Sequence, residues 1–140
     1  MDETCAPDPS GVIAEEPMAV LVVDDSISVR RGMARQLRSL GLKVREASDG
    51  LEALGRLRDA RYGLVLTDLE MPKLDGFALL AEIKRCPNLS TIPVIVASTR
   101  CDPETRRRLL ELGAHALLSK PVDPGELAQV VEPLLPSLRP

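Results

Sequence analysis

The sequence lacks the features that mark membrane, exported and nucleic-acid-binding proteins. No apolar run approaches the roughly 20 residues that cross a bilayer, and the amino terminus has no charged-then-apolar signal pattern. The 18 basic residues are outnumbered by 21 acidic ones, which gives a net charge of -3. We therefore expect no nucleic-acid partner and no membrane contact, because binding to either polyanion relies on a basic surface.

Residues that ligate metals through nitrogen or sulfur are also scarce. The single histidine, His115, has no second histidine beside it, and the three cysteines (Cys5, Cys86 and Cys101) have neither metal-ligand nor redox spacing. Their odd number favours a cytoplasmic location over an oxidising one. A site built on nitrogen or sulfur ligands is therefore not expected.

The length allows one domain. The 140 residues are 44% apolar, which is enough for a single core. Residues 1–17 hold five of the acidic residues, three prolines and no basic residue. We predict a disordered, acidic and proline-rich arm there, with an acidic docking tail as the alternative, and a folded domain over residues 18–138.

Short apolar runs alternate with helical patterns along the folded part. The expected strands are residues 19–23, 43–47, 64–66, 93–97 and 116–118. The expected helices are residues 26–40, 49 to about 61, 77–85, 103–112 and 124 to about 136. This alternation predicts an α/β fold, a doubly wound parallel sheet with five strands, five helices and right-handed crossovers.

The first two helices have recognisable apolar stripes. Val29, Met33, Leu37 and Leu40 recur at helical spacing in the first, and Leu51, Leu54 and Leu57 are expected to be buried by the second. The arginines at positions 30, 31, 35 and 38 lie off the first stripe. We interpret them as a solvated face.

Polar residues of complementary chemistry follow four of the expected strands. The four sets, in chain order, are Asp24 with Asp25, then Asp68, then Ser98, then Lys120. In an open parallel sheet the carboxyl ends of the strands lie at one edge, where such folds place their binding sites. Three carboxylates at one edge would repel unless a cation were present, and oxygen ligands without histidine or cysteine favour Mg²⁺.

These residues also carry a resemblance to a known family. Asp24-Asp25, Asp68 followed by Met71-Pro72, Asp75-Gly76, Ser98 and Lys120-Pro121 stand in the order and spacing of the CheY-like receiver domain of bacterial two-component response regulators. The run from Val22 to Arg30 is similar to receivers of chemotaxis-type hybrid histidine kinases. The resemblance implies the flavodoxin-like strand order 2-1-3-4-5.

The resemblance implies a phosphoryl transfer site. A histidine kinase or phosphotransfer domain would donate a phosphoryl group to Asp68, the phosphoacceptor, and Ser98 and Lys120 would contact the phosphoryl oxygens. Mg²⁺ would be held by Asp24, Asp25, Asp68 and the backbone carbonyl of Glu70. Such a domain is not an enzyme beyond its own phosphorylation and dephosphorylation.

Other positions match the switch and tuning positions of the family. Glu70 and Arg100 occupy the family's variable positions that tune the lifetime of the phosphoryl group, and Thr99 lies with Ser98 in the loop whose backbone shift would carry the switch. Leu117 stands where the family commonly has a tyrosine or phenylalanine switch, and Pro121 follows a peptide bond that is typically cis in the family. Downstream contacts are expected on the fourth helix, fifth strand and fifth helix. The run 106–108 of three arginines is interpreted as a solvated face, with contact to an acidic partner as the alternative.

Two other functions remain open from the residues. A degenerate receiver would dock partners without being phosphorylated. A Mg²⁺-dependent phosphohydrolase of the haloacid-dehalogenase type would use an aspartate nucleophile, although there the acids form Asp-x-Asp after the first strand and a cap domain is usual. We also expect no DNA-binding output domain, because none is present up to residue 140.

Overall fold

The computed structural model describes residues 18–138, so the arm predicted over residues 1–17 lies outside the described part. The strands are β1 (Ala19–Val23), β2 (Val44–Ala47), β3 (Tyr62–Asp68), β4 (Val94–Ser98) and β5 (Ala116–Ser119). They form one parallel sheet in the order β2-β1-β3-β4-β5, which confirms the predicted fold and order. All residues of β1, β3 and β4 are buried, as expected for parallel strands covered on both faces.

Helices connect the strands and cover both faces of the sheet. They are α1 (Ile27–Arg38), α2 (Gly50–Asp59), α3 (Gly76–Arg85), α4 (Pro103–Glu111) and α5 (Pro124–Val131). Each helix begins after a serine or aspartate whose side chain accepts a hydrogen bond from a backbone N–H of the first turn. These capping residues are Ser26, Asp49, Asp75, Asp102 and Asp123. Within residues 18–138, no helix has the length and apolar character needed to span a membrane.

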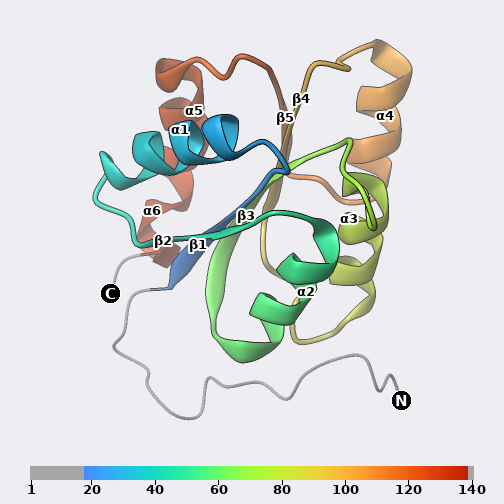
Figure 1. Cartoon of the computed structure of the whole chain (residues 1–140), viewed down its shortest axis with the longest axis horizontal. Helices are drawn as coiled ribbons and strands as arrows, with labels where there is room; N and C mark the ends of the chain where they lie inside the picture. Colours follow the sequence, from blue (N-terminus) through green and yellow to red (C-terminus); the bar gives the residue numbers. More distant parts are fainter. Residues whose placement is uncertain (1–17, 139–140) are drawn as a thin grey trace.

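The sheet separates two apolar cores. One lies under α1 and α5 and includes Leu37, Leu66 and Leu127. The other lies under α2, α3 and α4 and includes Val65, Leu80 and Leu109. Figure 1 shows α1 and α5 on one side of the sheet and α2, α3 and α4 on the other.

The chain after α5 departs from a single straight helix. Pro133 lacks the N–H that would continue the α-helical bonding, and the segment becomes the 3₁₀ turn η2 (Glu132–Leu134) followed by the short helix α6 (Leu135–Leu138). Leu138 is 1% exposed and packs against Gly63 in β3. The C-terminal segment therefore covers the end of the sheet where the strands begin.

One predicted burial is wrong, and the first residue of one apolar stripe is exposed. Leu51 is 54% exposed. The buried face of α2 is made by Gly50, Ala53 and Leu57, and Leu51 follows Gly50 in the chain, so its side chain points away from that face. Val29 is 36% exposed, so the buried stripe of α1 begins only at Met33.

Strand β3 also begins earlier than the run 64–66 indicated. Tyr62 pairs with Ala19 of β1, so the strand starts at Tyr62 and α2 ends at Asp59.

Candidate functional site

Four of the predicted site residues meet at the edge of the sheet where the strands end. Asp24 follows β1, Asp68 ends β3, Ser98 ends β4 and Lys120 follows β5. The parallel register, in which Asp68 pairs with Ala97 and Ser98 with Ser119, brings the strand ends level. Asp24 is 1% exposed, Asp68 8% and Ser98 1%, so these polar groups are enclosed and need partners.

Three carboxylates form a cluster at this edge. One carboxylate oxygen from each of Asp24, Asp25 and Asp68 lies within 4.8 Å of the others, and Asp25 alone of the three is exposed. Mg²⁺ takes oxygen ligands and keeps several waters. Two enclosed carboxylates with a third open to solvent fit such an ion, because they supply hard ligands and leave room for water.

Lys120 lies between two of these acids. Its Nζ is 2.6 Å from Asp24 Oδ2 and 3.0 Å from Asp68 Oδ1. Because β5 is two strands away from β3, only a long side chain can make this contact. The backbone N–H of Lys120 donates to the Ser98 carbonyl at 3.0 Å, and the Lys120–Pro121 peptide is cis, as the family pattern implied.

Burial and pairing shift the pKa values of these groups in opposite senses. Burial raises the pKa of Asp68, and the hydrogen bond from Lys120 opposes that rise without cancelling it. Burial by itself would lower the pKa of Lys120, but its hydrogen bonds to Asp24 and Asp68 outweigh burial and leave the pKa raised. Lys120 is therefore a firmly charged cation beside a carboxylate that is costly to ionise.

The loop after Asp68 is held by its own backbone. The Leu69 N–H donates to Asp68 Oδ1 at 2.8 Å, and the Gly76 N–H donates to the Leu69 carbonyl at 2.7 Å. A Cβ at Gly76 would lie 2.6 Å from the Asp68 carbonyl oxygen, closer than real Cβ contacts. Glycine is therefore required where α3 begins. The close packing of Gly76 against the backbone of Asp68 and Leu69 holds the Asp68 loop in place.

The predicted tuning residues surround Ser98. The Arg100 N–H donates to Ser98 Oγ at 2.9 Å, and Arg100 Nη1 lies 3.7 Å from Glu70 Oε2. Thr99 is exposed. Leu117 is 7% exposed and packs in the core under α4, so its side chain already points inward.

One residue that supports the site was missed at the sequence level. Arg30 was interpreted as part of a solvated face, but its side chain is only 12% exposed. Its Nη1 donates to the Asp24 carbonyl and its Nε to Glu46 Oε1, both at 2.9 Å. Helical spacing could not distinguish Arg30 from its arginine neighbours, because the contact with Glu46 depends on β2 pairing with β1.

An acidic cluster and a lysine at the carboxyl edge of a 2-1-3-4-5 sheet define the receiver class of signalling domain. The profile of the response regulator receiver domain matches residues 20–132, and the chain belongs to this family. Receiver domains bind Mg²⁺ through a cluster of aspartates and interact with histidine kinases or phosphotransfer proteins. They are signalling modules rather than enzymes in the usual sense.

Relatives and solved structures agree with this assignment. The chain is 44% identical over 114 residues to the gliding motility regulatory protein of Myxococcus xanthus, covering 81% of this chain and 14% of that protein. It is 38% identical to the two-component response regulator ORR3 of rice, covering 84% and 91% of the two chains. The structure of the chemotaxis response regulator CheY4 of Vibrio cholerae matches with a TM-score of 0.78 at 30% identity, covering 85% and 99%. The chain thus spans about a seventh of the length of the Myxococcus protein.

Proposed function

We propose that the domain accepts a phosphoryl group on Asp68 from a histidine kinase or phosphotransfer domain, in the cytoplasm that the composition favours. The observation that carries this proposal is the placement of the Lys120 ammonium 3.0 Å from Asp68 Oδ1. The Asp68 carboxylate is buried, is costly to ionise and is paired with a lysine from a distant strand. Such a combination is typical of functional sites, where the negative charge changes during a reaction.

The residues divide the chemistry among them. An Asp68 carboxylate oxygen would attack the phosphorus atom, and the bond from phosphorus to the donor nitrogen would break, with the electron pair leaving on that nitrogen. Lys120 would neutralise charge on the transferring oxygens, and the Ser98 hydroxyl would donate to one of them. Asp24, Asp25, Asp68 and the Glu70 carbonyl would hold Mg²⁺. When bound, Mg²⁺ would supply further charge neutralisation on the phosphoryl oxygens.

The direct test is the intact mass of the protein after incubation with acetyl phosphate, with and without Mg²⁺. Wild type should gain the mass of one phosphoryl group only with Mg²⁺, and Asp68→Asn should gain none. If wild type gains no mass from acetyl phosphate or from a phosphorylated kinase, phosphorylation-independent docking becomes the better explanation. Turnover of small phosphate esters would instead support the phosphohydrolase alternative.

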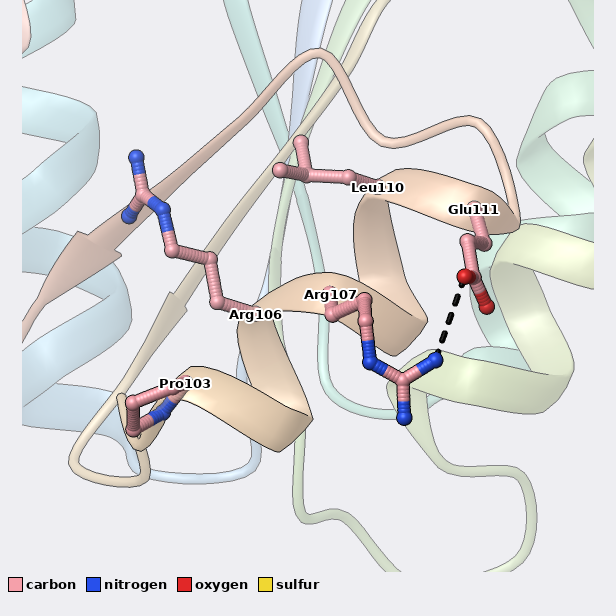
Figure 2. A pocket seen from close by; sticks show the side chains of 5 residues that line it. All are labelled: Pro103, Arg106, Arg107, Leu110 and Glu111. Atoms are coloured by element: carbon pink, nitrogen blue, oxygen red, sulfur yellow. Dashed lines mark hydrogen bonds and ion pairs between the residues drawn. The ribbon is translucent and has the colours of Figure 1, made fainter.

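We place the downstream contact on the face formed by α4, β5 and α5, with α4 as its charged part. Arg106, Arg107 and Glu111 are exposed there. Leu110, which lies between Arg107 and Glu111 in the chain, is 45% exposed. Figure 2 shows Arg107 paired with Glu111 on one side of α4 and Arg106 extending on the other. Arg108 instead lies 4.0 Å above the Phe77 ring. An apolar residue flanked by arginines suits an acidic partner with an apolar anchor.

The switch in this domain should not depend on an aromatic side chain. Leu117 is already buried, so it has no exposed position from which to swing inward. Phosphorylated wild type and phosphorylated Leu117→Ala should therefore gain partner affinity by the same factor. A lost gain in the variant would show that this side chain takes part in switching.

A further inference from the structure

Arg100 contacts three segments that meet beside Asp68. Its backbone N–H donates to Ser98 Oγ at 2.9 Å, its Nη1 lies 3.7 Å from Glu70 Oε2, and its Nη2 donates to Thr105 Oγ1 at 3.2 Å. Glu70 lies two residues after Asp68, and Thr105 lies in the first turn of α4. One guanidinium therefore connects the loop after β3 to the start of α4.

The contact with Thr105 continues into the cap of α4. The Thr105 hydroxyl, which accepts from Arg100, donates in turn to Asp102 Oδ1 at 2.7 Å, and the Thr105 N–H donates to Asp102 Oδ2 at 3.0 Å. Thr105 is 3% exposed, so its hydroxyl has little access to water. Loss of the guanidinium would leave this hydroxyl without its donor and loosen the first turn.

The contact with Glu70 is the weaker one. Both side chains are well exposed, 50% for Arg100 and 64% for Glu70, and 3.7 Å is long for a charge-assisted hydrogen bond. Exposed pairs of this kind add little to stability. A phosphoryl group carries more charge than one carboxylate and offers three acceptor oxygens, which a guanidinium can bind in a bidentate manner. A phosphoryl group nearby would therefore take the guanidinium from Glu70.

We propose that Arg100 is a positioning residue that ties the first turn of α4 to Glu70 until Asp68 is phosphorylated. The guanidinium then moves to the phosphoryl oxygens, releases Thr105 and frees the start of α4 to change position. This inference rests on the proposed phosphorylation of Asp68 and names how that event reaches α4. Arg100 would then be the side chain that moves on this side of the sheet, where Leu117 is already buried and cannot swing inward.

Amide hydrogen exchange at Thr105 and Arg106 tests this proposal, because both N–H groups are bonded to Asp102. The full chain would be measured with Mg²⁺, before and after acetyl phosphate. Phosphorylation should speed exchange at these amides about fivefold in wild type, since loss of a contact worth about 1 kcal/mol changes a local equilibrium by that factor. Arg100→Met should exchange about fivefold faster before phosphorylation and change little afterwards.

Arg107→Met is the matched control. It removes an arginine from α4 whose partner is Glu111, so it should keep the wild-type difference between the two states. Intact mass, recorded on the same samples, separates the two proposals. A wild type that gains no phosphoryl group would overturn the proposed function and this inference with it. A phosphorylated wild type with unchanged exchange, or an Arg100→Met variant that keeps the phosphorylation-dependent increase, would overturn the role of Arg100 alone.

Discussion

The two ends of the sheet use burial in different ways. Where the strands begin, apolar contacts close the structure, with Leu138 from α6 and Met18 packed around Gly63. Where the strands end, enclosed positions hold Asp24, Asp68 and Ser98. The same strands therefore lead from a packed end to a charged end.

This contrast shows how the fold separates stability from function. The apolar end gains from every buried methyl group, and nothing there depends on an exact charge. The charged end encloses Asp68, whose desolvation is unfavourable, and Lys120 compensates only part of that cost. Changes at the charged end should therefore respond to Mg²⁺ and pH, and changes at the apolar end should not.

The largest effect is expected from a pair of matched glycine substitutions. Gly76→Ala would place Cβ 2.6 Å from the Asp68 carbonyl oxygen and 2.8 Å from Leu69 Cα, and both neighbours are backbone atoms. We expect a loss of about 2 to 3 kcal/mol in unfolding free energy and reduced phosphorylation, measured by urea denaturation and intact mass.

Gly63→Ala is the counterpart at the apolar end. Its Cβ would lie closest to Cδ2 of Leu138, the end of a side chain that can move, and 3.1 and 3.3 Å from Cβ and Sδ of Met18. We expect a change within about 1 kcal/mol, since alanine also restricts the unfolded chain, and normal phosphorylation. Equal costs for the two substitutions would contradict the idea that the Asp68 loop is the rigid one.

These glycines also show what the sequence could predict. Asp75-Gly76 was recognisable as part of the receiver pattern just before an expected helix, and the strand-end acids, serine and lysine were recognisable because each follows an apolar run. The fold followed from that alternation, and the structure confirms it. Local pattern was sufficient wherever a residue's role depends on its place along one strand or helix.

Contacts between strands and loops could not be predicted in the same way. Arg30 binds Glu46 because β2 lies beside β1, and Arg100 binds Thr105 because the loop after β4 folds back on α4. The exposure of Leu51 depends on which neighbouring face α2 packs against. Each of these needs the arrangement of several elements, and one-dimensional spacing does not contain it.

A smaller effect is expected from removing the cation at the charged end. Lys120→Met leaves Asp24 and Asp68 enclosed without the ammonium that lies 2.6 and 3.0 Å from them. In EDTA we expect a loss of about 2 kcal/mol, which is less than the roughly 3 to 5 kcal/mol for breaking a fully buried pair because the Lys120 side chain is 15% exposed. Mg²⁺ should recover most of it, because the ion would neutralise the same carboxylates. Thermal unfolding with and without Mg²⁺ measures both values.

Lys73→Met is the control for that experiment. Lys73 lies 3.7 Å from Asp49 at the same end of the sheet, but its side chain is 65% exposed. Its loss should cost less than about 1 kcal/mol and be indifferent to Mg²⁺. If Lys120→Met is equally destabilised with and without Mg²⁺, the lysine acts through packing rather than charge.

The smallest effect, and the one of opposite sign, is expected from Asp68→Asn in EDTA. Burial raises the pKa of Asp68 above its ordinary 3.8, so between 3.8 and the raised value the folded state keeps a proton that the unfolded state has released. Unfolding then releases a proton, and stability falls as pH rises through that window. Above it the penalty is constant. Asparagine has no such penalty, so the variant should be more stable than wild type at neutral pH.

Two comparisons make this last prediction specific to the charged end. The advantage of Asp68→Asn should vanish below pH 3.8, where both states carry a protonated Asp68, and should reverse in Mg²⁺, because wild type keeps all three carboxylate ligands. Asp25→Asn, at the exposed member of the cluster, should give little gain in EDTA because its charge remains hydrated. If Asp68→Asn is less stable than wild type in EDTA at neutral pH, the attraction of Lys120 exceeds the cost of burying the carboxylate, and the charged end is stabilising even without a metal ion.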